Sequence, residues 1–239
     1  MKTIGFCNQK GGCGKTTLTI FLASYLAYDL KKRVIVLDCD YPQLSLKNTR
    51  NAELESLKES GENIPQQENI YAVESAEMKH FVSAKKAYEE QGYDYMLVDL
   101  PGSASNSEMM ICVSQLDYVF IPLETEKKAA RATFDFAAVV VNEFLYKDKY
   151  PLKSAHFIWS KFITNENTAG YEFIKNRLFA GFAERIEFLA THFNHSVAYK
   201  RPEFNRTISA LDRKIITKNK LNINELLEEI VQKIENNGQ

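Results

Sequence analysis

A glycine-rich turn close to the start of the chain sets the strongest limit on its fold. Residues 10–17 read Lys-Gly-Gly-Cys-Gly-Lys-Thr-Thr, directly after an apolar run at residues 3–7 that predicts a buried strand. Residues 15–30 then place apolar side chains at helical spacing. A phosphate-binding loop requires this setting, a glycine-rich turn between a strand and an amphipathic helix. The turn therefore predicts a nucleotide site at the end of the first strand.

The rest of the chain alternates between strand-like and helix-like patterns. Short apolar runs predict further strands at residues 34–37, 69–73, 95–98, 118–121 and 155–159. Helical patterns lie at residues 76–91, 126–146, 170–181 and 221–234. Near-continuous apolar strands between helices indicate an α/β fold, a mostly parallel β-sheet with helices on both faces.

The domain organisation follows from the same patterns. We expect a single domain over residues 1–239, with a C-terminal helix at about 222–236 packed on it. We interpret the polar stretch at residues 47–68 as an insertion after the second strand. Residues 187–206 stay ambiguous between strand and helix. The four cysteines lack metal-type pairing, so we expect them to be reduced and mostly buried.

The residues of the turn have complementary tasks in phosphate binding. Its glycines let successive backbone N–H groups surround the phosphates, and the helix that starts near Lys15 directs its positive end at the same anion. Lys15 reaches the terminal phosphates, and the Thr16 hydroxyl can take one coordination site of Mg²⁺. The predicted nucleotide-binding residues are Lys10, Gly11, Gly12, Cys13, Gly14, Lys15, Thr16 and Thr17.

The exact form of the motif points to one family. The general pattern G-x-x-x-x-G-K-[ST] is not met, because Gln9 stands where its first glycine would fall, whereas K-G-G-x-G-K-[ST] is met, with an extra lysine at Lys10. Residues 8–17 resemble the opening of the ParA/MinD family of deviant Walker A P-loop ATPases, and the prefix Asn8-Gln9 resembles its ParA branch, which serves plasmid and chromosome partition. The resemblance implies a P-loop NTPase domain that uses ATP and Mg²⁺.

The resemblance also implies how the protein would work. ATP would close two copies into a sandwich homodimer, in which Lys10 reaches the nucleotide of the partner copy. A cation on the charge that develops at the phosphates assists transfer, as an arginine finger does. Ser160 and Lys161, after the strand at residues 155–159, are expected near the base.

Acidic residues close two of the predicted strands. Asp38 and Asp40 follow the strand at residues 34–37, and Asp99 ends the strand at residues 95–98. Carboxylates beside a phosphate loop suit a metal shell and a water-positioning role. By the resemblance, Asp38 and Asp99 belong with Thr16 to the magnesium environment, and Asp40 orients the attacking water. The predicted catalytic residues are Lys10, Lys15 and Asp40.

The sequence departs from the family pattern at two places. Tyr41 is inserted before Pro42-Gln43, a variant similar to that of ParA-like proteins on conjugative transposons. Gly102 follows Pro101 where the family often has a second proline, and we expect it to give that loop freedom to sense the γ-phosphate. Asp117, before the strand at residues 118–121, fits the family pattern and is predicted to be structural.

The charge pattern bears on DNA binding. The net charge is −1, so any DNA contact must come from a local patch. Residues 200–220 hold seven basic and two acidic residues, and such a patch can hold the DNA backbone without reading sequence. The ParA resemblance favours non-specific DNA and a ParB-like stimulating protein as partners. The candidate DNA contacts are Lys200, Arg201, Arg206, Arg213 and Lys214.

The sequence is less compatible with other functions of the same fold. A MinD-like positioning ATPase would need a basic amphipathic tail helix, but residues 221–239 hold four glutamates and one lysine, so we expect no membrane partner. An iron protein of the nitrogenase type needs cluster cysteines that this sequence does not offer, and biotin-pathway ligases need substrate pockets that it does not reveal. A nucleotide switch with negligible hydrolysis remains an alternative. We expect a cytoplasmic, nucleoid-associated protein without a preceding operator-binding helix-turn-helix.

Overall fold

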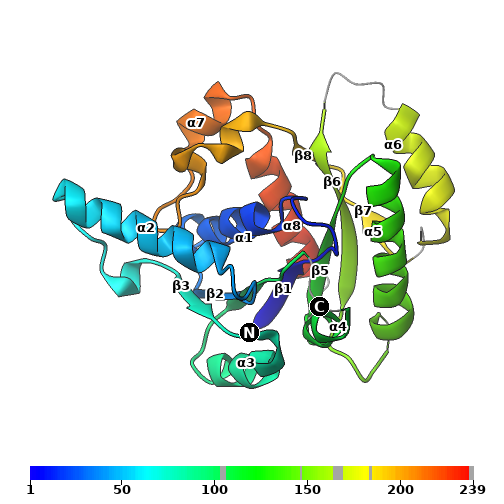
Figure 1. Cartoon of the computed structure of the whole chain (residues 1–239), viewed down its shortest axis with the longest axis horizontal. Helices are drawn as coiled ribbons and strands as arrows, with labels where there is room; N and C mark the ends of the chain where they lie inside the picture. The colour runs from blue at the N-terminus through cyan, green and yellow to red at the C-terminus, as the bar shows by residue number, and fades with distance from the viewer. Residues whose placement is uncertain (103–105, 146, 164–168, 183–184, 237–239) are drawn as a thin grey trace.

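One parallel sheet forms the centre of the molecule (Figure 1). The computed structural model describes residues 1–102, 106–145, 147–163, 169–182 and 185–236. The strand order is β3-β2-β4-β1-β5-β6-β7, and β8 pairs with β6. Each pairing among the described strands is parallel, so the sheet prediction is confirmed. The strands are β1 (Lys2–Phe6), β2 (Val34–Asp38), β3 (Ala72–Ser75), β4 (Tyr95–Asp99), β5 (Tyr118–Leu123), β6 (Ser154–Phe162), β7 (Glu187–Phe188) and β8 (Phe193–Asn194).

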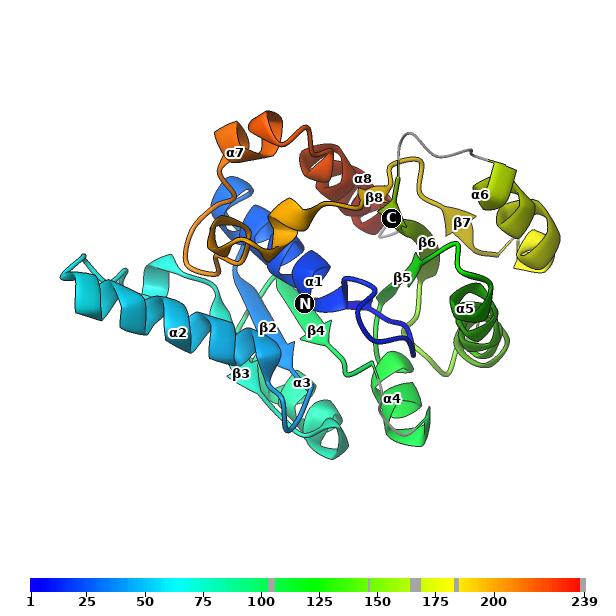
Figure 2. The same cartoon turned by 45° about the horizontal axis from the view of Figure 1, so that its top comes forward.

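Helices cover both faces of this sheet (Figure 2). One face carries α1, α2, α7 and α8, and the other carries α3, α4, α5 and α6. The α-helices are α1 (Lys15–Ser24), α2 (Ser45–Ser60), α3 (Phe81–Glu89), α4 (Asn106–Val113), α5 (Lys127–Val139), α6 (Ala169–Phe173), α7 (Arg213–Lys218) and α8 (Ile223–Asn236). π-helical turns continue α1, α5 and α6 at η1 (Tyr25–Asp29), η4 (Val140–Phe144) and η5 (Ile174–Leu178).

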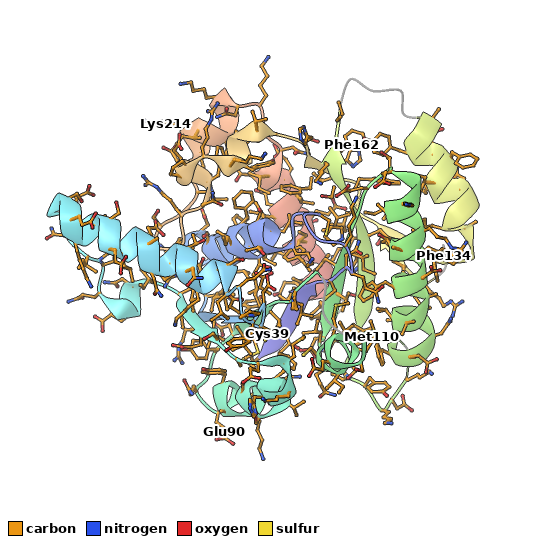
Figure 3. All side chains as sticks on the ribbon, viewed as in Figure 1. Cys39, Glu90, Met110, Phe134, Phe162 and Lys214 are labelled. Carbon is orange, nitrogen blue, oxygen red and sulfur yellow. The ribbon has the colours of Figure 1, made fainter. Side chains whose placement is uncertain are left out.

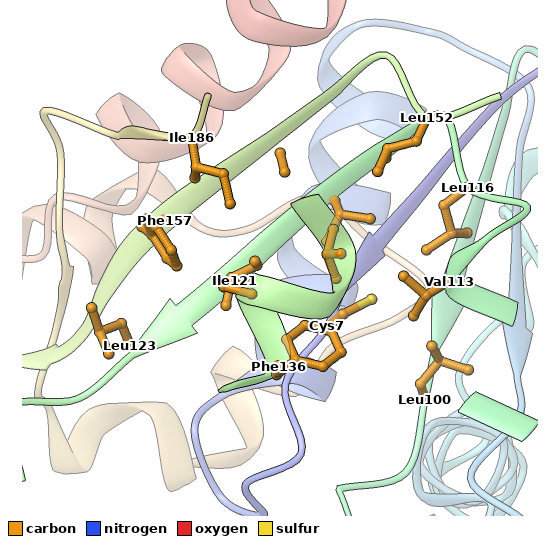
Figure 4. Packing of buried hydrophobic residues seen from close by; sticks show 14 of the residues in the cluster. Cys7, Leu100, Val113, Leu116, Ile121, Leu123, Phe136, Leu152, Phe157 and Ile186 are labelled. Carbon is orange, nitrogen blue, oxygen red and sulfur yellow. The ribbon is translucent and has the colours of Figure 1, made fainter. Parts of the chain in front are cut away.

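Strands β2 and β4 are apolar up to the aspartate that ends each of them, because both of their faces are covered. In β2, Ile35 and Leu37 pack into the core on the α3–α6 side, whereas Val34 and Val36 pack on the α1 side. Successive side chains of a strand point to opposite faces, so a strand between two helix layers needs a continuous apolar run. Figure 4 shows part of the core on the α3–α6 side of the sheet, where Cys7 lies near Ile121 and Phe136.

Some segments differ from their predicted form. Most of the polar stretch at residues 47–68, which we interpreted as an insertion after the second strand, lies in α2, and this helix buries only Leu46 and Arg50. A helix with so narrow a buried face lacks the apolar stripe that helical periodicity detects. Strand β3 runs Ala72–Ser75 rather than over residues 69–73, and α4 was not predicted at all. The ambiguous residues 187–206 hold β7, β8 and two short 3₁₀ turns, Val197–Lys200 and Pro202–Phe204.

Asp117 has a structural task at the edge of the core. The Asp117 carboxylate accepts hydrogen bonds from the Thr3 backbone N–H (2.8 Å) and the Thr3 hydroxyl (2.6 Å), joining the starts of β5 and β1.

All four cysteines are free and buried, as expected. The apolar stripe of α8 packs on the core, and Ile223 and Ile230 are completely buried. Among the described residues, no helix combines the length and the apolar character needed to cross a membrane.

Candidate nucleotide-binding site

The glycine-rich turn forms the wall of a pocket at the carboxyl end of the sheet. The turn links β1 to α1, and Gly12 and Gly14 have φ values of 73° and 93°, which side chains rarely adopt. At Gly14, an added Cβ would also lie 2.8 Å from the Phe193 ring. The pocket has a volume of about 370 Å³. It is lined by Gly11, Gly12, Gly14, Lys15, Thr16, Thr17, Asp40, Gln43, Leu100 and Gly102.

The turn is anchored to the sheet on both of its sides. The buried Asn8 amide donates to the Pro122 carbonyl (2.7 Å), and its oxygen accepts from the Lys10 backbone N–H (3.1 Å). The Ser160 hydroxyl donates to the Cys13 carbonyl (2.7 Å), so Ser160 holds the phosphate loop itself. Cys13 is buried and does not line the pocket wall. In the sequence Asn8 is noted only for its resemblance to the ParA branch. An asparagine directly before a glycine-rich turn is nevertheless a signal for such an anchor.

The two lysines of the turn have different surroundings. Lys15 is only 6% exposed, and its ammonium donates to the Lys10 carbonyl (3.0 Å) at the pocket wall. The Lys10 ammonium points away to two carboxylates, 2.7 Å from Glu124 and 3.2 Å from Glu126. Burial alone would lower the pKa of Lys10, but the hydrogen bonds and charges of these two glutamates outweigh it and raise that pKa. Lys161 lies 2.9 Å from the other oxygen of Glu124.

Asp38 and Asp40 take different positions although they lie two residues apart. Asp40 lines the pocket. Its pKa is raised by partial burial and by the Asp38 charge, with Lys15 acting in the opposite direction. The Asp38 carboxylate is completely buried and accepts from three backbone N–H groups: Asp40 (3.1 Å), Leu46 (3.0 Å) and Lys47 (2.9 Å). The structure therefore brings Asp40 to the pocket, while Asp38 caps the start of α2.

Asp99 is the acid whose surroundings fit a cation. It is 1% exposed, and neither of its carboxylate oxygens has a hydrogen-bond partner among the described residues. Burial raises its pKa to about 7, the nearby Asp38 charge adds to this rise, and Thr16 and Lys15 act against it. Asp99 lies directly across from Asp38 in the register of β4 and β2. Two unpartnered oxygens beside Thr16 are a suitable donor set for Mg²⁺, which binds through one or two carboxylates and substrate phosphates.

Gly102 lies against the phosphate loop. An added Cβ there would stand 2.7 Å from the Gly11 Cα and 3.0 Å from the Lys15 ammonium nitrogen. The distance to the Gly11 Cα is shorter than real Cβ atoms show, and a backbone atom cannot easily move away. The close approach explains on steric grounds why residue 102 is a glycine. The sequence did not reveal this contact, and the expectation from the sequence concerned only the freedom of the loop.

The predicted DNA contacts lie away from the pocket. Lys200, Arg201, Arg206, Arg213 and Lys214 are all exposed. They lie in α7 and in the segment between β8 and α7, and Figure 3 shows Lys214 on the outer side of α7. Arg213 pairs with Asp29 (3.2 Å). We call residues 200–214 the basic segment.

Comparison with known proteins places the chain. A model of the nucleotide-binding domain shared by CobQ, CobB, MinD and ParA proteins matches residues 4–237. The chain belongs to this CobQ/CobB/MinD/ParA family. The family predicted from residues 8–17 is therefore confirmed, and with it the P-loop fold of a family whose members are generally ATPases.

Curated relatives support the ParA branch. An uncharacterised ATP-binding protein of Methanocaldococcus jannaschii is 31% identical over 140 residues, covering 52% of this chain and 52% of that protein. A virulence-plasmid ParA family protein of Chlamydia psittaci is 50% identical over 46 residues, covering 19% of this chain and 17% of that protein. The chain thus spans about half or less of the length of these relatives.

Solved structures of the same fold cover nearly the whole chain. The ParA of pNOB8 superposes with a TM-score of 0.62 at 18% identity, covering 98% of this chain and 99% of that one. The same ParA has been solved bound to non-specific DNA, with a TM-score of 0.57 at 18% identity and the same shares covered. A plasmid partition protein of Borrelia burgdorferi bound to AMPPNP has a TM-score of 0.59 at 19% identity, covering 97% of this chain and 98% of that one.

Proposed function

We propose that this chain is a ParA-type ATPase that acts in DNA partition. In this proposal the whole chain works as one ATPase domain, associated with the nucleoid in the cytoplasm. ATP closes two copies into a dimer, the dimer binds DNA without reading sequence, and a ParB-like protein stimulates hydrolysis. The observation that carries the ATPase part is Asp99, which is buried without a hydrogen-bond partner in the described part of the chain, beside a pocket walled by Gly11, Lys15 and Asp40.

The pocket residues divide the chemistry among them. Backbone N–H groups of the glycine turn and the Lys15 ammonium hold the phosphates, and Cys13 contributes only its backbone. Thr16 and Asp99 would hold Mg²⁺, which would supply positive charge to neutralise the phosphates. Asp38 supports the proposed metal site indirectly, since its hydrogen bonds fix the start of α2 next to that site. Asp40, at the pocket wall with a raised pKa, is placed to orient a water molecule.

Lys10 supplies the reason to expect a dimer. Its ammonium lies on Glu124 and Glu126 rather than in its own pocket, so it can serve the nucleotide of a second copy. The AMPPNP-bound partition protein of Borrelia burgdorferi supports ATP as the nucleotide.

The DNA part of the proposal stands on exposed charge. The five cations of the basic segment are exposed, and phosphate contacts by lysine and arginine need no base reading. A dimer presents the segment twice, which strengthens weak contacts through avidity. The pNOB8 ParA bound to non-specific DNA supports this partner.

A comparison of nucleotide states tests the proposal. DNA retention on a non-specific duplex and particle mass are measured with ATP and Mg²⁺, with ADP, and without nucleotide, for the wild type and for Lys10→Ala. We expect ATP alone to produce a dimer and salt-sensitive DNA retention, and Lys10→Ala to lose both. ATP binding without any DNA retention at low salt would remove the DNA part.

The alternative is a nucleotide switch with negligible hydrolysis. In this alternative the ion pairs of Lys10 with Glu124 and Glu126 persist after ATP has bound, so the cation stays away from the phosphates and hydrolysis is negligible. Asp40→Ala separates the two functions. A hydrolysis-driven cycle would stop in the DNA-bound dimer, whereas a switch would keep its partner recruitment unchanged.

A further inference from the structure

Helix α2 joins the nucleotide pocket to the basic segment. Its first turn is held by Asp38, whose carboxylate accepts the backbone N–H groups of Leu46 (3.0 Å) and Lys47 (2.9 Å). Figure 1 shows the chain before α7 descending onto the middle of α2. The contact there centres on Thr207, the residue after Arg206, and the Thr207 side chain is completely buried.

Two charged residues of α2, Arg50 and Glu53, form hydrogen bonds with Thr207. Arg50 donates from Nε to the Thr207 hydroxyl (2.6 Å) and from a terminal nitrogen to the Thr207 carbonyl (2.7 Å). Glu53 accepts from the Thr207 backbone N–H (2.7 Å) and from its hydroxyl (2.8 Å). We call this arrangement of Arg50, Glu53 and Thr207 the clamp.

The clamp is rigid enough to transmit movement. The third Arg50 nitrogen donates to the Tyr71 carbonyl (2.9 Å), and the guanidinium lies 4.6 Å from the centre of the Tyr71 ring. Arg50 is only 5% exposed, so its bonds are shielded from water. Hydrogen bonds to charged groups are the strong ones, and their loss leaves a buried charge without a partner. Thr207 therefore follows α2 when α2 moves.

The start of α2 lies next to residues that line the nucleotide pocket. Asp40 and Gln43 line the pocket, and the Gln43 carbonyl accepts from the Asn48 side chain of α2 (2.8 Å). Between them and the helix stands Leu44, with φ at 44° in the left-handed region. A leucine in this conformation is strained and persists only where its surroundings impose it. A ligand that contacts Asp40 and Gln43 therefore acts on a strained link at the start of α2.

We propose that α2 couples the nucleotide pocket to DNA affinity, through its attachment to Asp38 at its first turn and to Thr207 at the clamp in its middle. The proposal rests on the function proposed above and states how that function is regulated. Nucleotide at the pocket shifts the link at Leu44, α2 follows, and the clamp sets the position of the basic segment. Arg50, Glu53 and Thr207 are positioning residues, since none of them lines the pocket and both Arg50 and Thr207 are buried.

Thr207→Val tests the clamp, and Tyr28→Phe is its matched control. Valine keeps the shape of threonine but removes the hydroxyl that Arg50 and Glu53 share. Tyr28 donates to the same Thr207 carbonyl (2.8 Å) from η1 rather than from α2. DNA affinity is measured with and without ATP and Mg²⁺, beside ATP affinity and dimer mass.

We expect the ratio of DNA affinity with ATP to that without it to fall by about fivefold or more in Thr207→Val. ATP affinity and dimer mass stay at wild-type values, and Tyr28→Phe keeps the wild-type ratio. Glu53→Gln, which keeps the hydroxyl of Thr207, gives a smaller fall in the ratio and serves if Thr207→Val does not fold. A wild-type ratio in both clamp variants, or an equal loss in Tyr28→Phe, overturns the coupling through α2.

Hydrogen exchange in the wild type separates this coupling from DNA binding. The Thr207 amide donates to Glu53, so its exchange rate reports on the clamp directly. We expect ATPγS with Mg²⁺ to change that rate, and an unchanged rate overturns the coupling. If the rate changes but the wild type retains no DNA in any nucleotide state, the DNA function fails while the link from pocket to segment stands.

Discussion

The ammonium of Lys10 lies 2.7 Å from the Glu124 carboxylate, and neither residue lines the pocket beside the glycine turn. Glu124 is 12% exposed and also pairs with Lys161, so it is a well-fixed anion. Burial alone would raise the pKa of Glu124, but Lys10 and Lys161 outweigh it and lower that pKa. Lys10 must leave this carboxylate before it can reach another subunit.

Glu124→Gln should therefore ease ATP-dependent dimerisation. Removing the charge weakens the contact that holds Lys10 within its own subunit, and partly exposed ion pairs of this kind contribute about 0.2–1 kcal/mol. We expect the dimer dissociation constant with ATP to fall by about two- to fivefold in analytical ultracentrifugation. Glu126→Gln is the control: Glu126 is 61% exposed and lies 3.2 Å away, so its effect should be smaller. Weaker dimers in Glu124→Gln would instead place Glu124 in the dimer contact.

Gly102→Ala should weaken ATP binding. The new methyl group would stand 2.7 Å from the Gly11 Cα and would push the loop after β4 away from the phosphate loop. Such overpacking costs about 1–3 kcal/mol, or roughly 5- to 150-fold in the dissociation constant for ATP if it falls on the bound state. Isothermal titration calorimetry measures the change. Gly170→Ala should bind ATP normally, because an added Cβ there meets nothing within 4 Å, and an unchanged constant in Gly102→Ala would show that the loops separate freely.

The sequence predicted what periodicity and motif spacing carry, and it missed what tertiary contacts decide. The phosphate loop and the acids Asp38, Asp40 and Asp99 could be found because each lies where an apolar strand ends. Residues 47–68 looked like an insertion because α2 turns few apolar side chains inward. Its buried contact uses Arg50, a residue that local pattern reads as exposed.

The same limit applied to side chains around the site. Glu124 and Ser160 contact the phosphate loop although they lie more than 100 residues away from it in the sequence. Asn8 ties the loop to the sheet through its buried side-chain amide. No spacing rule connects such residues, since the order of strands in the sheet brings them together. The two aspartates of β2 and the following loop share one strand end, yet hydrogen bonds to α2 hold only Asp38 in the interior.

Asp99→Asn should separate cation binding from stability. The carboxylate is buried without a hydrogen-bond partner among the described residues, so the neutral amide should leave the nucleotide-free protein at least as stable in urea unfolding. Loss of a group that only orients a metal ligand already costs about 10- to 100-fold in metal affinity, so loss of Asp99, a proposed ligand, should weaken Mg²⁺-dependent ATP binding at least about tenfold. Asp117→Asn provides the contrast, since its carboxylate accepts two hydrogen bonds from Thr3. It should lose about 1–3 kcal/mol of stability and keep its Mg²⁺ dependence. A destabilised Asp99→Asn would mean that the native carboxylate has a stabilising partner.

His156 should make the protein sensitive to mild acid. The ring is 4% exposed and stacks on Phe120 at 5.3 Å, and burial, with a contribution from Lys233, lowers its pKa to about 4. Between the ordinary pKa of about 6.5 and this value, the unfolded chain binds a proton that the folded chain does not, so the free energy of unfolding falls as pH decreases. From pH 7.5 to pH 5, His156 should account for a loss of about 2 kcal/mol. Urea unfolding of His156→Gln should show a pH dependence weaker by that amount, whereas the exposed-site variant His195→Gln should follow the wild type. Equal slopes in all three proteins would mean that His156 takes up its proton without unfolding.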